Sequence, residues 1–98
     1  MADISGSIRL AVDSGEVVLG MRSSVAAIRD NTAKLIIVAS KNKRGLVEDI
    51  EHLAKLADIK VVKFDGDSME LGVVCGKQHS VSSLAIINPG NSKILEEV

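Results

Sequence analysis

The run Leu35-Ile36-Ile37-Val38-Ala39 decides the fold of this chain. An unbroken apolar run of this length is typical of a strand that is buried on both faces, as in a sheet with helices on either side. The polar and basic segment Ser40–Gly45 follows and predicts a surface loop. Beyond it, apolar residues recur at helical spacing over residues 46–57, with Glu51 and Lys55 on the exposed face. This order of strand, loop and amphipathic helix indicates an α/β protein.

The same alternation of strand and helix patterns extends over the whole chain. Gly15 and Gly76 are expected to end helices in a left-handed conformation, and Ser23 or Ser24 to cap the second helix. The predicted elements are a helix over residues 4–14, a strand over Val17–Leu19, a helix containing Val25 and Ile28, the strand Leu35–Ala39, a helix with Leu46, Ile50, Leu53 and Ala57 on its buried face, a strand over Ile59–Phe64, a turn at Asp65-Gly66-Asp67, a helix over Ser68–Cys75, a strand over Val81–Ile87, a turn at Asn88–Gly90, and a terminal helix carrying Ile94 and Leu95.

The order αβαβαβαβα predicts a three-layer α/β/α sandwich with a four-stranded mixed sheet. A chain of 98 residues is enough for one core, so residues 1–98 are expected to form a single domain. Phe64 is the only aromatic residue, so that core must be aliphatic. The longest segment without Asp, Glu, Lys or Arg is Gln78–Ser92, shorter than the ~18 residues that span a bilayer, and no membrane association is expected.

The termini and the cysteine content suggest a compartment. The N-terminal residues include Asp3 and Gly6, where a secretory signal would have a basic start and an apolar run. Cys75 is the only cysteine and cannot close a disulfide within the chain, which agrees with a reducing environment. We therefore expect an intracellular, cytoplasmic protein.

The formal net charge of −1 argues against a nucleic-acid partner only if the charge is spread evenly. Residues 1–44 hold seven Lys and Arg against four Asp and Glu, a balance of +3. Residues 45–98 hold five against nine, a balance of −4. The first part of the chain therefore carries charge suited to phosphates, although the total is acidic.

Two glycine-rich segments resemble phosphate-binding loops without matching their motif. Gly15–Gly20 is followed by Met21 and Arg22, where the motif requires Lys and then Ser or Thr. The segment Gly72–Gln78 is one residue too short and lacks the metal-binding hydroxyl group. Neither segment predicts nucleotide hydrolysis.

Other reactive side chains also have plain structural interpretations. The acidic segment Asp65-Gly66-Asp67 is interpreted as a turn, because phosphoryl chemistry would need a metal held by further acids. Cys75 and His79 could form a ligand pair, yet zinc takes three or four protein ligands and His52 is the only other histidine. We expect no catalytic residue, no metal site and no cofactor, hence not an enzyme. A small nucleotide-binding or phosphotransfer protein is the alternative from another class.

Three loops at expected strand ends carry residues suited to RNA. After the first strand, Gly20 permits close approach of a backbone, Arg22 offers a planar fork of donors, and Ser23-Ser24 open a helix with free N–H groups. A basic run follows the second strand, and His79, before the last strand, can stack on a base. The alternative is an ordinary turn beside solvated charges. The predicted RNA-binding residues are Gly20, Met21, Arg22, Ser23, Ser24, Lys41, Asn42, Lys43, Gly76, Lys77, His79 and Ser80.

Six stretches occur in the order and at the spacing of a known family. They are Gly15–Gly20 followed by Met-Arg-Ser-Ser, Ala33–Ala39, Glu48–Glu51, Glu70–Gly72, Gly76–His79 and Asn88–Ser92. On these residues the whole chain, without evident insertion, resembles the ribosomal protein thirty family of the archaeal and eukaryotic large subunit. That family is part of the kink-turn RNA-binding superfamily.

The resemblance implies a three-layer sandwich that binds a sharply bent RNA at an internal loop with sheared G·A pairs. In the family, the loop and helix start after the first strand enter the kink, and Gly20, Arg22 and Ser23 match that region. The loops after the second strand and before the last strand grip the backbone and an extruded base, and Lys77 and His79 match the latter. Eukaryotic members have a phenylalanine in place of His79, so weaker stacking is expected here.

Two further positions depart from the family pattern. Arg22 stands where a lysine is common, which keeps the charge and adds bidentate geometry toward guanine. Lys41 lies near a position where the family often has asparagine, so we expect phosphate contacts through Lys41 and Lys43 in place of base-specific hydrogen bonds.

The function implied by the resemblance is that of a structural component of the large ribosomal subunit. Such a protein binds and stabilises a kink-turn in ribosomal RNA, is a monomer when free, and works in the cytoplasm within the ribosome. Two alternatives keep the fold: a kink-turn protein of another ribonucleoprotein, or a regulator of its own messenger RNA.

Overall fold

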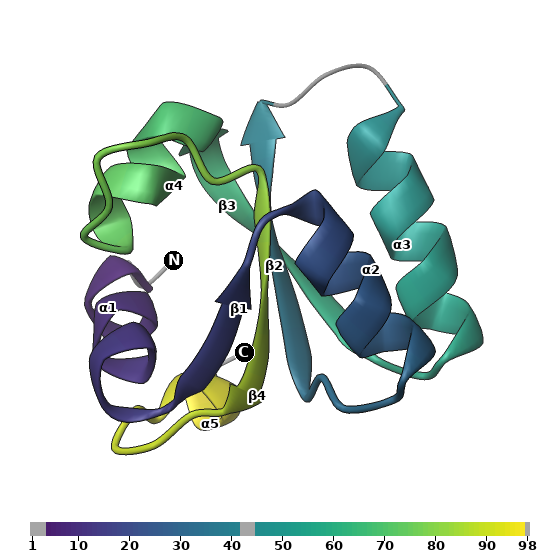
Figure 1. Ribbon diagram of the computed structural model, residues 1–98, viewed down its shortest axis with the longest axis horizontal. Helices are drawn as coiled ribbons and strands as arrows, with labels where there is room; N and C mark the ends of the chain where they lie inside the picture. The colour runs from purple at the N-terminus through teal and green to yellow at the C-terminus, as the bar shows by residue number, and fades with distance from the viewer. Residues whose placement is uncertain (1–3, 42–44, 98) are drawn as a thin grey trace.

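The computed structural model describes residues 4–41 and 45–97 of the chain. Its strands form a four-stranded sheet in the order β1-β4-β2-β3, in which β2 and β3 are parallel and the other neighbours are antiparallel (Figure 1). The elements are α1 (Ser5–Ser14), β1 (Glu16–Leu19), α2 (Met21–Arg29), β2 (Leu35–Lys41), α3 (Leu46–Leu56), β3 (Lys60–Asp67), α4 (Ser68–Val74), β4 (Ser83–Asn88) and α5 (Ile94–Glu97).

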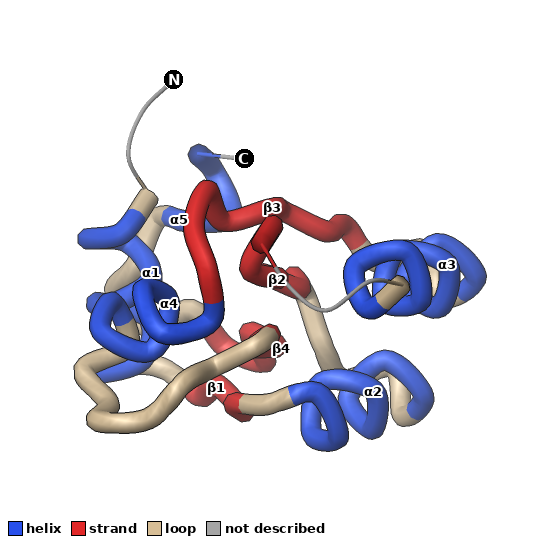
Figure 2. Tube along the Cα trace, turned by 90° about the horizontal axis from the view of Figure 1, so that it is seen from above, coloured by secondary structure: helices blue, strands red, loops and turns tan. Residues whose placement is uncertain are grey.

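Helices cover both faces of this sheet. α1, α4 and α5 lie on one face, and α2 and α3 lie on the other (Figures 1 and 2). A separate apolar cluster fills each interface: one contains Ile8 of α1 and Leu71 of α4, the other Ile28 of α2 and Ile50 of α3. The predicted three-layer α/β/α sandwich with a four-stranded mixed sheet is confirmed.

β2 lies between β4 and β3 and contributes to both clusters. Leu35 and Ile37 face α1 and α4, whereas Ile36 faces α2 and α3, as the two-residue period of a strand requires. Each of these three side chains is at most 1% exposed. Burying one such side chain stabilises a fold by about 1.5–3 kcal/mol, so this single strand supports both interfaces. The core is aliphatic apart from Phe64, as predicted.

β3 continues through Asp65-Gly66-Asp67, so the predicted turn is wrong. The parallel register extends far enough to place Lys41 of β2 opposite Asp67. Asp67 then begins α4 with a capping box: its carboxylate accepts the Glu70 N–H at 2.9 Å, and the Glu70 carboxylate accepts the Asp67 N–H at 3.4 Å. Pairing with β2 therefore overrides the local turn preference of the acidic segment.

Gly15 ends α1 without the predicted left-handed conformation. Its backbone is extended, with φ −113° and ψ −161°. A Cβ at this position would overlap the Asn88 carbonyl oxygen and lie 2.8 Å from the Gly90 nitrogen. The turn after β4 packs directly on this part of the chain, where the Asn91 N–H also donates to Ser14 Oγ at 3.0 Å. Glycine is required here by a contact between distant segments and not by its own φ angle.

α2 begins at Met21, so Gly20 occupies its N-cap position. The prediction that Ser23 or Ser24 caps this helix is wrong, because no side chain caps it.

Within residues 4–41 and 45–97, no helix is both long and apolar enough to cross a membrane.

Candidate nucleic-acid interface

Chain segments that are distant in sequence meet where β1 and β2 end and β4 begins (Figure 2). The Gly20 N–H donates to the Ser83 carbonyl oxygen at 2.8 Å and joins the β1–α2 turn to β4. On the other side of β4, the Ala39 N–H donates to the Ser82 carbonyl oxygen at 3.0 Å. We call this end of the sheet, formed by Gly20, Ala39 and Ser82–Ser83, the loop edge.

The β1–α2 turn combines an open backbone with an exposed arginine. Gly20 has φ +100° and ψ 161°, a conformation essentially confined to glycine. Nothing lies within 4 Å of the place that a Cβ would take, so a ligand backbone can approach this turn closely. Arg22 and Ser23 follow and are exposed. Because no side chain caps α2, the positive end of the helix dipole faces solvent beside them.

Met21 and Ser24, two of the predicted RNA-binding residues, fasten this turn to the sheet. Ser24 is fully buried, and its hydroxyl donates to the Gly20 carbonyl oxygen at 2.7 Å. It accepts a hydrogen bond from Ser83 Oγ at 3.2 Å, and the half-buried Met21 has its Sδ 4.0 Å from the same hydroxyl. Ser24 therefore shapes the turn from inside, while Arg22 can reach a ligand.

β2 brings Lys41 to the loop edge. Lys41 is the last residue of the strand and is exposed. The nearest acid in the register, Asp67, uses its carboxylate to cap α4. Asn42 and Lys43, which the sequence also predicts to bind RNA, lie outside the described residues.

Gly76 ends α4 in the left-handed conformation that the sequence predicts, with φ +76°. The Lys77 N–H donates to the Gly72 carbonyl oxygen at 2.9 Å and completes the helix end. The Arg9 guanidinium of α1 packs against Gly76, where a Cβ would lie 2.6 Å from one of its nitrogens. Gly76 and Lys77 therefore lie beside α1, and the chain reaches the loop edge only as it enters β4.

His79 and Ser80 are exposed on a backbone that α4 holds firmly. The Val81 N–H donates to the Ser68 carbonyl oxygen at 2.9 Å. Gly72 in α4 lies so close to this segment that a Cβ there would overlap the His79 carbonyl oxygen. The His79 ring nitrogen Nδ1 lies 3.0 Å from the Ser80 carbonyl oxygen, a contact that orients the imidazole. A firm backbone with an exposed ring suits contact with a base.

An open hollow of about 600 Å³ lies on the surface of α2. Met21, Val25 and Ala26 form its apolar part, and Arg22 and Arg29 line it as well. The hollow is continuous with the β1–α2 turn because Met21 and Arg22 belong to both. It gives the loop edge an extension that is apolar in the middle and basic at both ends.

Comparison with known proteins covers the chain almost from end to end. A model of the ribosomal protein L7Ae/L30e/S12e/Gadd45 family matches residues 2–96. The chain belongs to this family. It is 41% identical over 98 residues to large ribosomal subunit protein eL30 of Methanobrevibacter smithii, covering 100% of this chain and 99% of that one. It is 46% identical over 96 residues to the protein of the same name from Methanothermobacter thermautotrophicus, covering 98% of each. The resemblance stated from the six sequence stretches is confirmed.

This L7Ae/L30e-type chain keeps its single cysteine inside the fold. Cys75 is buried in the cluster between the sheet, α1 and α4. Burial raises the pKa of its thiol from 9.0 to about 11, against the opposing effect of the positive charges of Lys77 and Arg9. Within the described part of the chain, no three His, Cys, Asp or Glu side chains gather where they could hold a metal ion. A neutral buried thiol is a core side chain and not a reactive nucleophile.

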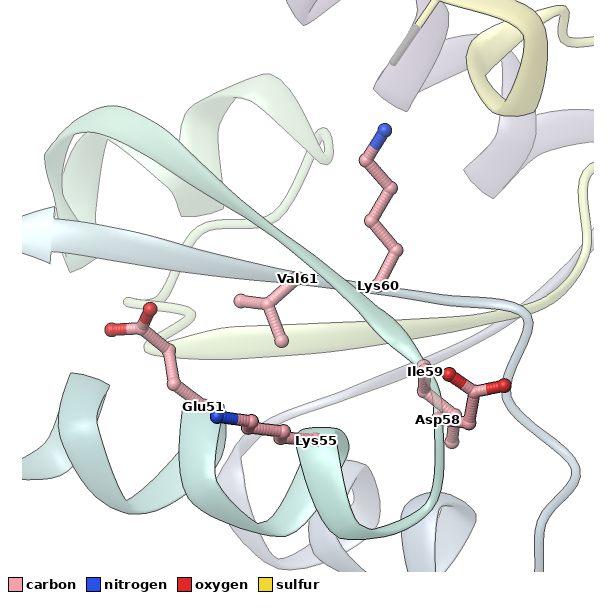
Figure 3. Close-up of a pocket in the computed structure, with 6 residues that line it drawn as sticks. All are labelled: Glu51, Lys55, Asp58, Ile59, Lys60 and Val61. Carbon is pink, nitrogen blue, oxygen red and sulfur yellow. The ribbon is translucent and has the colours of Figure 1, made fainter.

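A second hollow, of about 470 Å³, lies between α3 and the outer side of β3 (Figure 3). The side chains of Glu51 and Val61 point toward each other across it, whereas Lys60 points away. β3 starts here, and because β3 runs parallel to β2, its start lies at the other end of the sheet from the loop edge. Opposite charges alternate along this hollow, so it lacks the excess of one sign that would attract a charged ligand.

Sequence reasoning did not select two features of the loop edge in this family member. Ser83 holds the β1–α2 turn and Ser82 accepts a hydrogen bond from β2, and both contacts become visible only once β4 is paired with its neighbours. Arg29 lines the same hollow as Arg22. Its position seven residues later, two helical turns along the same face, is a signal that could have identified it.

Proposed function

We propose that this chain is a non-enzymatic structural component of the large ribosomal subunit, and that it binds and stabilises a kink-turn-type internal loop of ribosomal RNA. The relatives that align over nearly its full length bear the name of a large-subunit protein, which supports the assignment to the ribosome. On this proposal residues 1–98 are a single RNA-binding domain that is monomeric when free, needs no cofactor and works in the cytoplasm.

The observation that carries the RNA part of the proposal is the geometry of the β1–α2 turn. Gly20 leaves open space where any other residue would place a side chain. Arg22 stands directly beside that space, at the positive end of α2. An RNA strand can thus come close to the turn while the guanidinium forms two parallel hydrogen bonds with a base edge or a phosphate.

The other predicted residues extend this contact to two sides. Lys41, with Asn42 and Lys43 after it, supplies positive charge for phosphates beyond β2. His79 and Ser80 lie on the segment that enters β4, where the ring can stack on an extruded base. Gly76 and Lys77 lie beside α1, at the start of this segment, and we expect Lys77 to contact the RNA backbone at the border of the interface.

The mechanism is stabilisation of one RNA conformation. A free internal loop samples straight and kinked forms, and a protein that fits only the kinked form shifts the population by its differential affinity. The hydrogen bonds from Gly20 to Ser83 and from Ser24 to Gly20 fix the turn before RNA arrives. A preformed turn reduces the ordering cost on binding and favours recognition of shape over sequence.

A gel-shift titration with a kink-turn RNA and a straight duplex of equal length tests the proposal. We expect clear preference for the kink-turn RNA at fixed salt concentration; equal affinity for both RNAs would refute shape recognition. When a lysate of cells that express the tagged protein is fractionated by sedimentation, the protein should also cosediment with large ribosomal subunits. Kink-turn binding without such cosedimentation would instead support a role in another ribonucleoprotein or on a messenger RNA.

A further inference from the structure

The surface of α2 carries two arginines, one in its first turn and one at its end, that form no ion pair with any described residue. Arg22 and Arg29 line one hollow, with Met21, Val25 and Ala26 between them. The ion pairs between described residues join Arg9 to Asp13 and Lys63 to Glu51, and neither α2 arginine takes part in them. Asp30, the C-cap residue of α2, follows Arg29 but forms no ion pair with it. Both guanidinium groups are therefore available to a ligand.

Carboxylates border the loop edge in the other directions. The first turn of α3, which follows β2, carries the exposed Glu48 and Asp49. The end of β3 and the start of α4 carry Asp65, Asp67 and Glu70. Because β3 is parallel to β2, this second acidic group lies at the same end of the sheet as Lys41. These carboxylates repel a polyanion beyond Lys41, so an RNA that contacts Lys41 is not drawn further over α3 or α4.

We propose that the bound RNA continues from the loop edge along α2, and that Arg29 binds a backbone phosphate of one stem flanking the kink. This inference rests on the proposed function and adds the path of the RNA over the protein. α2 is the direction in which the surface is basic at both ends of a hollow and free of acidic lining residues.

The dimensions of α2 agree with this path. Seven residues at ~1.5 Å per residue separate Arg22 from Arg29 by about 10 Å along the helix axis. On the B-form rise of roughly 3.4 Å per step, the two arginines are about three nucleotide steps apart along the axis of a stem. The apolar side chains between them leave room for riboses, which carry no charge.

Arg29→Gln tests the proposal, with Lys55→Gln on α3 as the matched control. Both side chains are exposed, and Lys55 lines the hollow at the opposite end of the sheet. Each variant is titrated with a long-stem kink-turn RNA and with two RNAs in which one stem or the other is trimmed to the pairs that close the loop. Circular dichroism and urea unfolding check that both variants fold as the wild type does.

We expect Arg29→Gln to weaken binding of the long-stem RNA about five- to eightfold at 0.1 M salt and to lower the slope of log K against log salt by roughly 0.7–0.9. The effect should vanish with one of the trimmed RNAs, and Arg29→Lys should restore most of the affinity. Lys55→Gln should bind like the wild type.

Three results would overturn the proposal: unchanged affinity of Arg29→Gln, the same loss with both trimmed RNAs, or an equal loss in Lys55→Gln. The first excludes a contact, the second places Arg29 at the loop itself, and the third shows a general effect of charge. Failure of the wild-type protein to prefer a kink-turn RNA is a separate outcome, which would refute the proposed function and not only the path over α2.

Discussion

Gly72 and Gly6 are both glycines in helices, and the structure predicts opposite effects for replacing them with alanine. Alanine has a higher helix propensity than glycine by up to about 1 kcal/mol, so propensity alone predicts that both substitutions stabilise the fold. Gly6 in α1 is exposed, and nothing lies within 4 Å of the Cβ position. Gly72 in α4 is buried against the backbone of the segment that precedes β4.

The cost of Gly72→Ala follows from what its Cβ would meet. The methyl group would overlap the His79 carbonyl oxygen and lie 3.1 Å from the His79 carbonyl carbon and 3.4 Å from Ser80 Cα. All three are backbone atoms, and the Val81 N–H, hydrogen-bonded to Ser68, limits how far this segment can shift. Overpacking of this kind costs about 1–3 kcal/mol. After the gain in propensity, we expect a net loss of about 1–2 kcal/mol.

Urea unfolding measures both changes, with the midpoint compared at an unchanged m value. Gly72→Ala should lower the free energy of unfolding by about 1–2 kcal/mol and lower Tm by about 4–8 °C per kcal/mol. Gly6→Ala should raise the free energy of unfolding by about 0.5–1 kcal/mol. A Gly72→Ala protein as stable as the wild type would refute the close approach of α4 to His79, and a destabilised Gly6→Ala would refute the reasoning from open space.

Three further predictions concern the site and the buried thiol. Arg22→Ala should weaken binding to a kink-turn RNA by about 1–3 kcal/mol, the range for one bidentate base contact, and an unchanged Kd at fixed salt would remove Arg22 from the site. Replacing Lys41 and Lys43 with glutamine should reduce the slope of log K against log salt by roughly 0.9 per lost phosphate contact; the wild-type slope in this variant would mean that both are merely solvated. Burial raises the pKa of Cys75 from 9.0 to about 11. The folded state therefore favours the protonated thiol. The resulting contribution to the free energy of unfolding is complete below the pKa of the unfolded state and is lost as the pH rises through the pKa of the folded state. Between these pH values the free energy of unfolding should fall by about 2 kcal/mol more in the wild type than in Cys75→Ala, as measured by urea unfolding at each pH. The same pH dependence in both proteins would contradict the raised pKa.

Most of the secondary structure could be predicted because it depends on residues that are neighbours in sequence. The run Leu35–Ala39 is a buried strand, and the spacing of apolar residues over 46–57 does correspond to a helix. Gly76 ends α4 with a positive φ, because a helix end poses the same local problem in any fold. Two of the wrong predictions, at Gly15 and at Asp65-Gly66-Asp67, concern segments whose conformation depends on a distant part of the chain.

The candidate site also has features that the sequence predicts and features that depend on distant contacts. Gly20 and Arg22 could be selected from the sequence, because a glycine followed by a basic residue at a helix start suits an anion whatever the surroundings. The buried position of Ser24 could not be predicted from the sequence, because it depends on the contact with Ser83 of β4. Nor could the separation of Lys77 from the turn be predicted, since it depends on the packing of α4 against α1.

By itself, the sequence determined the alternation of strands and helices, the aliphatic core, the family, and the turn that combines an open glycine with an arginine. These follow from periodicity and propensity, which act within one or two helical turns or along one strand. Only the tertiary structure decided the order of the strands, the extension of β3, and the contact with the turn after β4 that requires Gly15. The sequence gives the net charge of −1 but not where the charges lie. The parallel pairing of β2 with β3 and the position of α2 decide which sides of the loop edge are basic and which are acidic.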